Sequence, residues 1–238
     1  MNKLLFNRKL IIGVGLIGSS IARALRENNI SSEIHGMDNN EEVLTKCQNL
    51  KILTSGKKNL KDFSDQFDLI VICSPLGTYN KIFSLINYFV KQPTLVTDVG
   101  STKVSVIKDY RDVCNNQNIQ FVPSHPIAGI EKSGPEYGFA ELFKNRFCIL
   151  TPINNNDDFI DRIKFFWEAI GLEIQTMDAE HHDRVLAMTS HIPQLIAYSI
   201  VATASELETH IRAEVIKYSA AGFRDFTRLA GSDPIMWR

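Results

Sequence analysis

Three glycines at fixed spacing, Gly13, Gly15 and Gly18, make one turn of this sequence suitable for holding a nucleotide. The first glycine permits a tight bend after a strand, the second lets backbone approach a pyrophosphate, and the third lets the next helix pack close to the strand. The anion then lies on the helix N-terminus, where unpaired N–H groups favour negative charge. Residues 13–18, including Leu16 and Ile17, are therefore predicted to bind a dinucleotide; a purely structural turn is the alternative.

Asp38 follows the next predicted strand, 33–37, roughly twenty residues beyond Gly18. A carboxylate at that point can accept a hydrogen bond from the 2′-hydroxyl of an adenosine ribose. A 2′-phosphate would meet its negative charge, so Asp38 favours NAD over NADP. The alternative is a turn or a helix cap before Glu41.

His125 follows the predicted strand 119–122 and lies between Pro123 and Pro126. Two prolines restrict the backbone, so we expect His125 in a rigid loop outside regular structure. A rigid histidine at the carboxyl end of a strand is placed for chemistry. The alternative is a loop histidine that bonds to backbone.

The elements that must position these residues alternate between strand and helix. Strands are predicted at 9–12, 33–37, 68–73, 94–98, 119–122, 147–150 and 173–177, and the intervening helices at 17–25, 41–50, 79–90, 103–116 and 157–169. This alternation predicts a doubly wound parallel sheet of the α/β class. Ligands lie beyond the carboxyl ends of such strands, so Ser74 and Pro75, after strand 68–73, should border the cofactor.

After residue 177 no further strands are predicted. Asp178 can cap a long helix, and Pro193 should kink that helix beside His191. We therefore expect two domains, 1–177 with the sheet and 178–238 all-helical. Ser232, Asp233 and Pro234 predict a helix start with only four residues left, so we expect either a helical domain shortened at its C-terminal end or a partner chain that covers it.

Composition narrows the class of partner. The 238 residues are 44% hydrophobic and 22% charged, with a formal net charge of −1, which gives no electrostatic reason to expect nucleic acid or an anionic membrane. The N-terminus lacks a signal peptide and no stretch reaches membrane-spanning length, so a cytoplasmic location is expected. The four cysteines lack CxxC spacing, and His181, His182 and His191 lack the spacing of metal ligands, so no metal is expected.

Several short segments carry a family resemblance when they are taken together. They are residues 13–18, 98–101, 124–129, 131–134, 190–193 and 222–228. The sequence resembles the prephenate/arogenate dehydrogenase family of tyrosine biosynthesis along nearly its whole length. The resemblance implies an N-terminal Rossmann-type sheet, a helical C-terminal dimerisation domain and a homodimer.

The resemblance also implies a reaction: NAD-dependent oxidative decarboxylation of prephenate to 4-hydroxyphenylpyruvate. His125 matches the family's catalytic histidine, which accepts the proton of the substrate hydroxyl, a task for which a neutral imidazole is suited. Ser101 matches the serine that bonds the same hydroxyl and the histidine, near the nicotinamide. Ring aromatisation drives the loss of carbon dioxide, so the protein has to orient the substrate more than activate it.

Prephenate carries two carboxylates, which a planar guanidinium binds well. Arg228 matches the family's substrate arginine, and Arg224 lies one helical turn earlier. By resemblance His191 lines the substrate pocket and Glu131 is a gating residue at its entrance. The alternatives are a solvated basic surface for the two arginines and a structural bond to the kinked helix for His191.

Three other functions stay open at this point. Arogenate differs from prephenate by an ammonium group in place of a keto group, and no residue chooses between them. A different β-hydroxyacid or imine-reducing dehydrogenase would need a lysine or aspartate in the helical domain, where this sequence has His191. A non-catalytic NAD(H)-binding module is the third.

Overall fold

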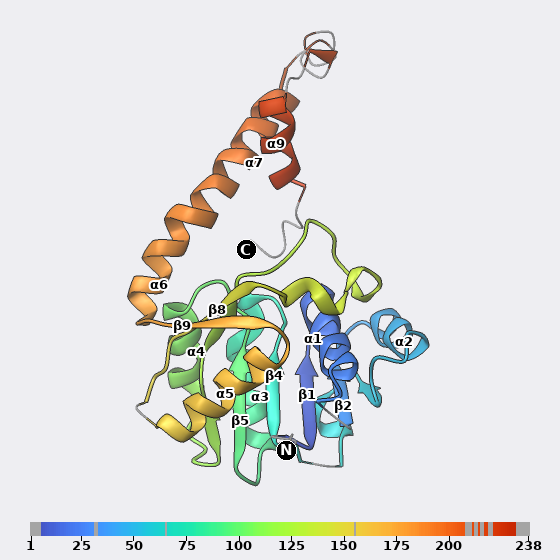
Figure 1. Ribbon diagram of the computed structural model, residues 1–238, viewed down its shortest axis with the longest axis vertical. Coiled ribbons are helices and arrows are strands. Elements are labelled where there is room, and N and C mark those ends of the chain that lie inside the picture. Colours follow the sequence, from blue (N-terminus) through green and yellow to red (C-terminus); the bar gives the residue numbers. More distant parts are fainter. Residues whose placement is uncertain are drawn as a thin grey trace.

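Six parallel strands form the central sheet, in the order β3-β2-β1-β4-β5-β6 (Figure 1). The structure is a computed structural model that describes residues 6–30, 33–64, 66–154, 156–207, 211, 214, 217–218 and 221–231. The strands are β1 (Arg8–Ile12), β2 (Glu33–Met37), β3 (Ser55–Lys57), β4 (Leu69–Ile72), β5 (Thr94–Asp98) and β6 (Ile119–Phe121). The order reverses direction at β1, which confirms the doubly wound sheet expected from the sequence.

The strand register brings the carboxyl ends of three strands to one level. Ile12 at the end of β1 lies opposite Met37 of β2 and Ile72 of β4. The loops after these strands therefore start side by side. This edge is where the order of the strands reverses, and where ligands bind in such sheets.

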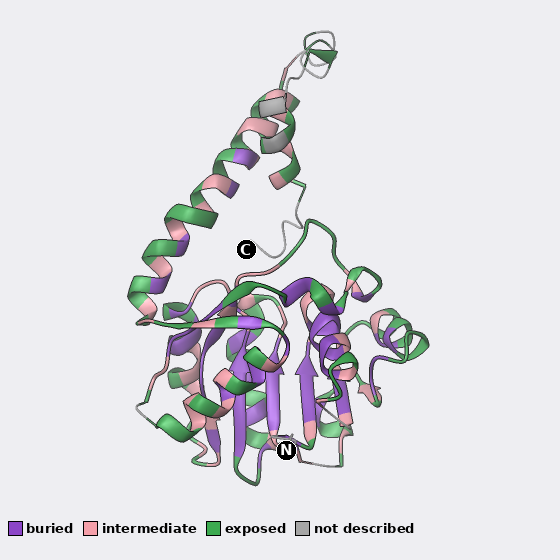
Figure 2. Cartoon of the chain, viewed as in Figure 1, coloured by how far each residue is buried: buried purple, intermediate pink, exposed green. Residues whose placement is uncertain are grey.

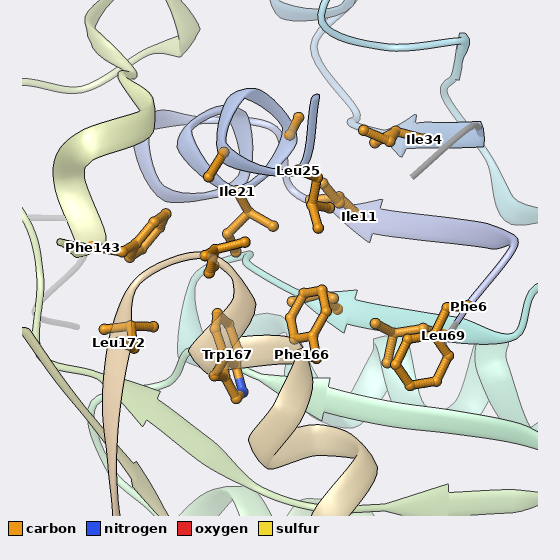
Figure 3. Packing of buried hydrophobic residues seen from close by; sticks show 14 of the residues in the cluster. Phe6, Ile11, Ile21, Leu25, Ile34, Leu69, Phe143, Phe166, Trp167 and Leu172 are labelled. Atoms are coloured by element: carbon orange, nitrogen blue, oxygen red, sulfur yellow. The ribbon is translucent and has the colours of Figure 1, made fainter. Parts of the chain in front are cut away.

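Alternate residues of β1 face the two layers of helices that cover the sheet. The helices on one face are α1 (Leu16–Glu27), α2 (Glu41–Asn49) and α5 (Asp157–Ala169), and those on the other are α3 (Tyr79–Phe89) and α4 (Val104–Val113). Ile11 belongs to the first core cluster, whereas Leu10 and Ile12 belong to the second. Figure 3 shows side chains of α1, α5 and β1 gathered in the first cluster. Burial on both faces explains why these strands are continuous apolar runs.

The third strand of the sheet was not expected. The sequence predicts a polar, lysine-rich link after α2, but residues 55–57 form β3 at the edge of the sheet. Ser55 pairs with His35 of β2, and its hydroxyl lies 2.7 Å from His35 Nδ1. A three-residue edge strand depends on backbone pairing, so its side chains carry no alternating pattern.

Short 3-10 helices occupy Leu60–Asp62 (η1), Leu76–Thr78 (η2), Pro135–Tyr137 (η3) and Ala140–Phe143 (η4).

A second sheet of three strands lies beyond the first, and it corrects two expectations. It contains β7 (Ser124–Pro126), β8 (Arg146–Leu150) and β9 (Leu172–Thr176), with β7 antiparallel to β8 and β8 parallel to β9. The segment near 173–177 is therefore not the last strand of the main sheet. His125 is likewise not outside regular structure, because it pairs with Ile149. Proline is tolerated at the end of a short edge strand, which is where Pro126 lies.

A long helical segment leaves the sheet domain and is mostly exposed (Figures 1 and 2). It consists of α6 (Ala179–Leu186), a π-helical turn η5 (Ala187–His191) and α7 (Ile192–Ser205). Pro193 lacks an N–H to bond the carbonyl of Thr189, so the ladder of hydrogen bonds changes at the predicted kink. Helix α9 (Ala221–Leu229) runs back along α7, and Gln194 Nε2 donates to the carbonyl of Leu229 at 2.8 Å. Residues 232–234, where the sequence predicts a helix start, lie outside the described residues.

Within the described part of the chain, this continuous helix, 179–205, is long and apolar enough to cross a membrane by length and composition. The mean hydropathy of its most apolar window is 1.4, and 17% of that window is buried. The expectation that no stretch reaches this length was wrong, because the helix continues through Pro193. Exposed apolar side chains on this helix, such as Met188 and Leu195, are typical of a contact surface.

Candidate functional site

The glycine turn between β1 and α1 has a different steric reason at each glycine. Gly13 has φ of 89°, and a Cβ there would lie 2.8 Å from the backbone of Cys73. A Cβ on Gly18 would overlap the carbonyl oxygen of Gly13. A Cβ on Gly15, in contrast, would have no described atom within 4 Å. Gly13 and Gly18 therefore permit the turn itself, whereas Gly15 faces open space that a ligand can enter.

The first turn of α1 has backbone donors available for an anion. Gly15 is the N-cap residue and supplies no side-chain cap, and no acidic residue lies in the first turn. Leu16 and Ile17 are partly exposed there. These features fit a pyrophosphate on the helix N-terminus, with the close approach made at Gly15.

Asp38 joins the glycine turn to the loop after β2 through hydrogen bonds of its carboxylate. Its Oδ2 accepts from the backbone N–H of Val14 and its Oδ1 from that of Asn40, both at 3.0 Å. Asn40, and not Asp38, is the side-chain cap of α2. Each carboxylate oxygen can accept more than one hydrogen bond, so the turn role of Asp38 is compatible with binding a ribose hydroxyl.

Two further loops border the same edge of the sheet. Ser74 and Pro75 follow β4, where Ser74 Oγ accepts from Thr78 Oγ1 at 3.0 Å. Ser101 follows β5 and is partly exposed. The predicted cofactor-binding residues thus come from loops after β1, β2, β4 and β5.

A buried ion pair between Lys103 and Asp98 joins the end of β5 to the start of β7. Lys103 Nζ lies 2.6 Å from Asp98 Oδ2 and donates to the carbonyl of Ser124 at 2.6 Å. Asp98 Oδ1 in turn accepts from the N–H of Ser124 at 3.0 Å, and both charged side chains have no exposed surface. Ser101 lies in the loop between Asp98 and Lys103, and His125 follows Ser124, so the pair fixes both segments. Lys103 and Asp98 were not identified from the sequence as site residues, although their five-residue spacing across a strand end was a usable signal.

His125 is partly exposed and bonds to a histidine from the helical segment. Its Nδ1 lies 2.9 Å from His182 Nε2, and His182 Nδ1 lies 2.7 Å from Asp183 Oδ1. Burial, and then the nearby charge of Lys103, lower the pKa of His125 well below its ordinary value. Sequence reasoning missed His182 and Asp183, which are separated from His125 by more than fifty positions.

The predicted substrate residues come from three segments. Arg228 of α9 forms an ion pair with Glu131, which follows β7, and both side chains are well exposed. This hydrogen bond lowers the pKa of Glu131, after the larger effect of its own backbone N–H. His191, at the end of η5, lies close enough to His125 to contribute to lowering its pKa. Arg224 is exposed on α9, one turn before Arg228.

The loops after β1, β2, β4 and β5 share one edge of the sheet, the Lys103–Asp98 pair joins this edge to β7, and Arg228 meets Glu131 on the loop after β7. A nucleotide can lie along the glycine turn, a neutral imidazole can accept a proton, and guanidinium groups can bind carboxylates. Among the described residues, no group of three or more histidine, cysteine or acidic side chains could hold a metal ion.

Two family models match this chain, and together they cover most of it. The nucleotide-binding domain of prephenate dehydrogenase matches residues 21–176, and the dimerization domain of prephenate dehydrogenase matches residues 178–238.

Individual relatives agree with these family models. Cyclohexadienyl dehydrogenase of Zymomonas mobilis is 40% identical over 234 residues, which are 98% of this chain and 79% of that protein. Prephenate dehydrogenase of Bacillus subtilis is 34% identical over 96% of this chain, which spans 62% of that protein and so less than two thirds of it. The crystal structure of prephenate dehydrogenase from A. aeolicus, in complex with hydroxyphenyl propionate and NAD+, has a TM-score of 0.88 and 36% identity, covering 98% of this chain and 80% of that one.

Proposed function

Because this chain belongs to the prephenate dehydrogenase family, we propose that it oxidises and decarboxylates prephenate to 4-hydroxyphenylpyruvate with NAD, in tyrosine biosynthesis. The family makes it a dehydrogenase; the substrate is the proposal. The observation that carries this proposal is the partly exposed imidazole of His125, tied through Ser124 and Asp98 to the edge of the sheet at which the glycine turn lies.

His125 is the proposed base. Oxidation of the ring carbon that bears the hydroxyl requires an acceptor for the hydroxyl proton. The lowered pKa of His125 keeps the imidazole neutral near pH 7, and its Nε2 is the ring nitrogen that does not face His182. Ser101 is proposed to bond the substrate hydroxyl and His125. Departure of the ring carboxylate as carbon dioxide leaves an aromatic ring, so that step needs orientation by the protein.

The cofactor is NAD, which accepts the hydride from the substrate carbon when bound. The steric freedom at Gly15 supports a pyrophosphate beside Gly13, Leu16, Ile17 and Gly18. Asp38 is proposed to bond the adenosine ribose. Ser74, Pro75 and Ser101 are proposed to border the nicotinamide end.

The substrate carboxylates are proposed to bind Arg228 and His191, with Arg224 in support. Arg228 already holds a carboxylate, that of Glu131. A substrate carboxylate would replace it, which is the exchange expected of a gating residue.

The dimerization-domain match supports a homodimer. We propose a division near residue 177 into a nucleotide-binding domain, 1–177, and a helical domain, 178–238. A biosynthetic role in tyrosine formation supports a cytoplasmic location.

Purified protein incubated with prephenate and NAD+ should produce NADH, followed by absorbance. His125→Asn should lower turnover by roughly 10²–10⁴-fold while NAD affinity stays within twofold. His181→Asn, an exposed histidine on α6, is the matched control. Normal turnover of the His125 variant would exclude His125 as the base.

A second candidate substrate is arogenate. The most identical of the relatives above is named a cyclohexadienyl dehydrogenase, and both prephenate and arogenate are cyclohexadienyl compounds. Parallel reactions with arogenate, and with NADP+, separate these choices. Turnover of arogenate alone would keep the mechanism and change the substrate, and tight NAD binding without any turnover would favour a binding module.

A further inference from the structure

A hydrogen-bonded row of three side chains, His125, His182 and Asp183, joins the second sheet to helix α6. We propose that His182 and Asp183 are positioning residues that hold the hydrogen of neutral His125 on Nδ1 and leave the lone pair on Nε2, toward the substrate. This inference rests on the proposed function, because it concerns the base of that reaction.

Asp183 sets the direction of the row. Its Oδ1 accepts from the backbone N–H of Lys103 at 2.7 Å, and its Oδ2 from that of Val104 at 3.0 Å. Backbone N–H groups only donate, so both oxygens act as acceptors, and the first turn of α4 favours an ionised carboxylate there. The nitrogen of His182 that faces Oδ1, at 2.7 Å, must therefore carry a hydrogen.

His182 transmits this direction to His125. The His182 side chain has no exposed surface, and burial lowers its pKa, opposed in part by the hydrogen bond to Asp183. A neutral ring has one hydrogen, and with that hydrogen on Nδ1 its Nε2 can only accept. His125 Nδ1, 2.9 Å away, must then be the donor. The remaining nitrogen of His125, Nε2, has the free lone pair that a base requires.

The surroundings of His125 oppose a second hydrogen on its ring before the reaction. The charged or ionisable groups that act on its ring are Lys103 at the cap of α4, His182 of α6 and His191 of η5, and the thiol of Cys148 of β8 lies against its backbone N–H. Lys103 is held between Asp98 and the carbonyl of Ser124, so its charge stays in place. Once His125 accepts the substrate proton, the imidazolium donates to His182, and Asp183 stabilises the row at its other end.

The first measurement is the tautomer of His125 in the substrate-free protein, from ¹H–¹⁵N correlations of its ring at pH 7. A hydrogen on Nδ1 with a lone pair on Nε2 is expected, and a hydrogen on Nε2 would overturn the proposal. This readout does not depend on turnover. Failure of the proposed function, with no turnover of prephenate by the wild type, is thus distinguishable from failure of this inference.

The second measurement compares variants of the row. In Asp183→Asn the amide can donate to His182, which reverses the direction and puts the hydrogen of His125 on Nε2. We expect kcat to fall by about 10²-fold or more, with KM and NAD affinity within about twofold. His182→Gln keeps an acceptor toward His125 and should retain more activity than His182→Leu, which has none.

Two controls guard against misfolding and a merely structural role. His181→Gln, on the same helix but exposed, should match the wild type in kcat and in the tautomer of His125. Asp183 also binds the start of α4, so Asp183→Asn can fail to fold. In that case the comparison of His182→Gln with His182→Leu still tests whether His125 needs an acceptor at this position. Equal kcat values and an unchanged tautomer in that pair would overturn the proposal.

Discussion

At the scale of single residues, His125 is surrounded by groups that disfavour its protonation. Lys103 carries a buried ammonium, and His182 and His191 add further potential positive charge. A charged imidazole would also lose water on burial. All of these effects lower the pKa of His125, so the ring is neutral and able to accept a proton.

The lowered pKa of His125 should make stability depend on pH. Between that pKa and the ordinary value of about 6.5, the unfolded chain binds more protons than the folded one. The free energy of unfolding should therefore rise with pH across this window, by up to about 1.4 kcal/mol per pH unit. This stabilisation is lost progressively as the pH falls below about 6.5. Urea unfolding of wild type and His125→Asn at several pH values measures this. A slope that is the same in both proteins would contradict the assignment to His125.

The geometry of Arg228 matters if it binds a carboxylate through two parallel hydrogen bonds. Arg228→Lys keeps the charge but loses the planar fork, so KM for prephenate should rise by about 10-fold or more, from the loss of one charged hydrogen bond. Steady-state kinetics measure this, with Arg111→Lys, on the exposed end of α4, as the control. Equal KM values would place the substrate carboxylates elsewhere.

At the scale of elements, the turn between β1 and α1 separates two uses of glycine. Gly18→Ala should lower the unfolding free energy by about 1–3 kcal/mol, since the new methyl group overlaps the backbone of Gly13. Gly15→Ala should leave stability unchanged, because nothing described lies within 4 Å, and weaken NAD binding by about tenfold, or about 1.4 kcal/mol.

Thermal unfolding and NAD titration test both glycine variants in one series. Each variant is the control of the other, because the two changes add the same methyl group to the same turn. Wild-type NAD affinity in Gly15→Ala would mean that the open space beside this residue is not where the pyrophosphate lies.

The sequence predicted those helices and strands whose apolar pattern lies within the element itself. Apolar runs identified β1 and β4, because a strand buried on both faces needs them. It did not reveal β3, which is short and at an edge, nor the separate sheet that contains β7. Both depend on pairing between distant segments, which leaves little trace in the residues themselves.

The candidate site divides in the same way. Gly13, Gly15 and Gly18 are recognisable because one turn contains them. The partners of His125 are not, because His182 reaches it across 57 positions and has an identical residue type, the exposed His181, as its neighbour in sequence. Only the docking of α6 against the start of α4 distinguishes the two histidines.

At the scale of the whole molecule, the helical segment presents an apolar stripe to solvent. Met188, Ile192, Leu195 and Ile196 are between 40% and 67% exposed and lie at helical spacing. This segment belongs to the part matched by the dimerization domain, and burial of such a stripe between two copies would stabilise a dimer.

Leu195→Asp should therefore convert dimer to monomer, as measured by sedimentation equilibrium. Tyr88→Asp is the control, because Tyr88 of α3 is more exposed, at 81%, but lies on the sheet domain. A wild-type mass equal to that of one chain, or a Leu195→Asp variant that remains a dimer, would contradict this use of the helix.

The residues of the proposed reaction are divided between the sheet and the helical segment that follows it. Residues before 178 include the whole glycine turn and His125, yet His182 and Asp183 lie on the first helix after them. The sheet domain alone would resemble many generic nucleotide carriers, with a histidine whose ring is free to adopt either tautomer. The helical segment supplies both the side chains that orient the His125 ring and the apolar surface for dimer formation. A sheet domain inherited without this segment would therefore bind the cofactor but would lack an oriented base.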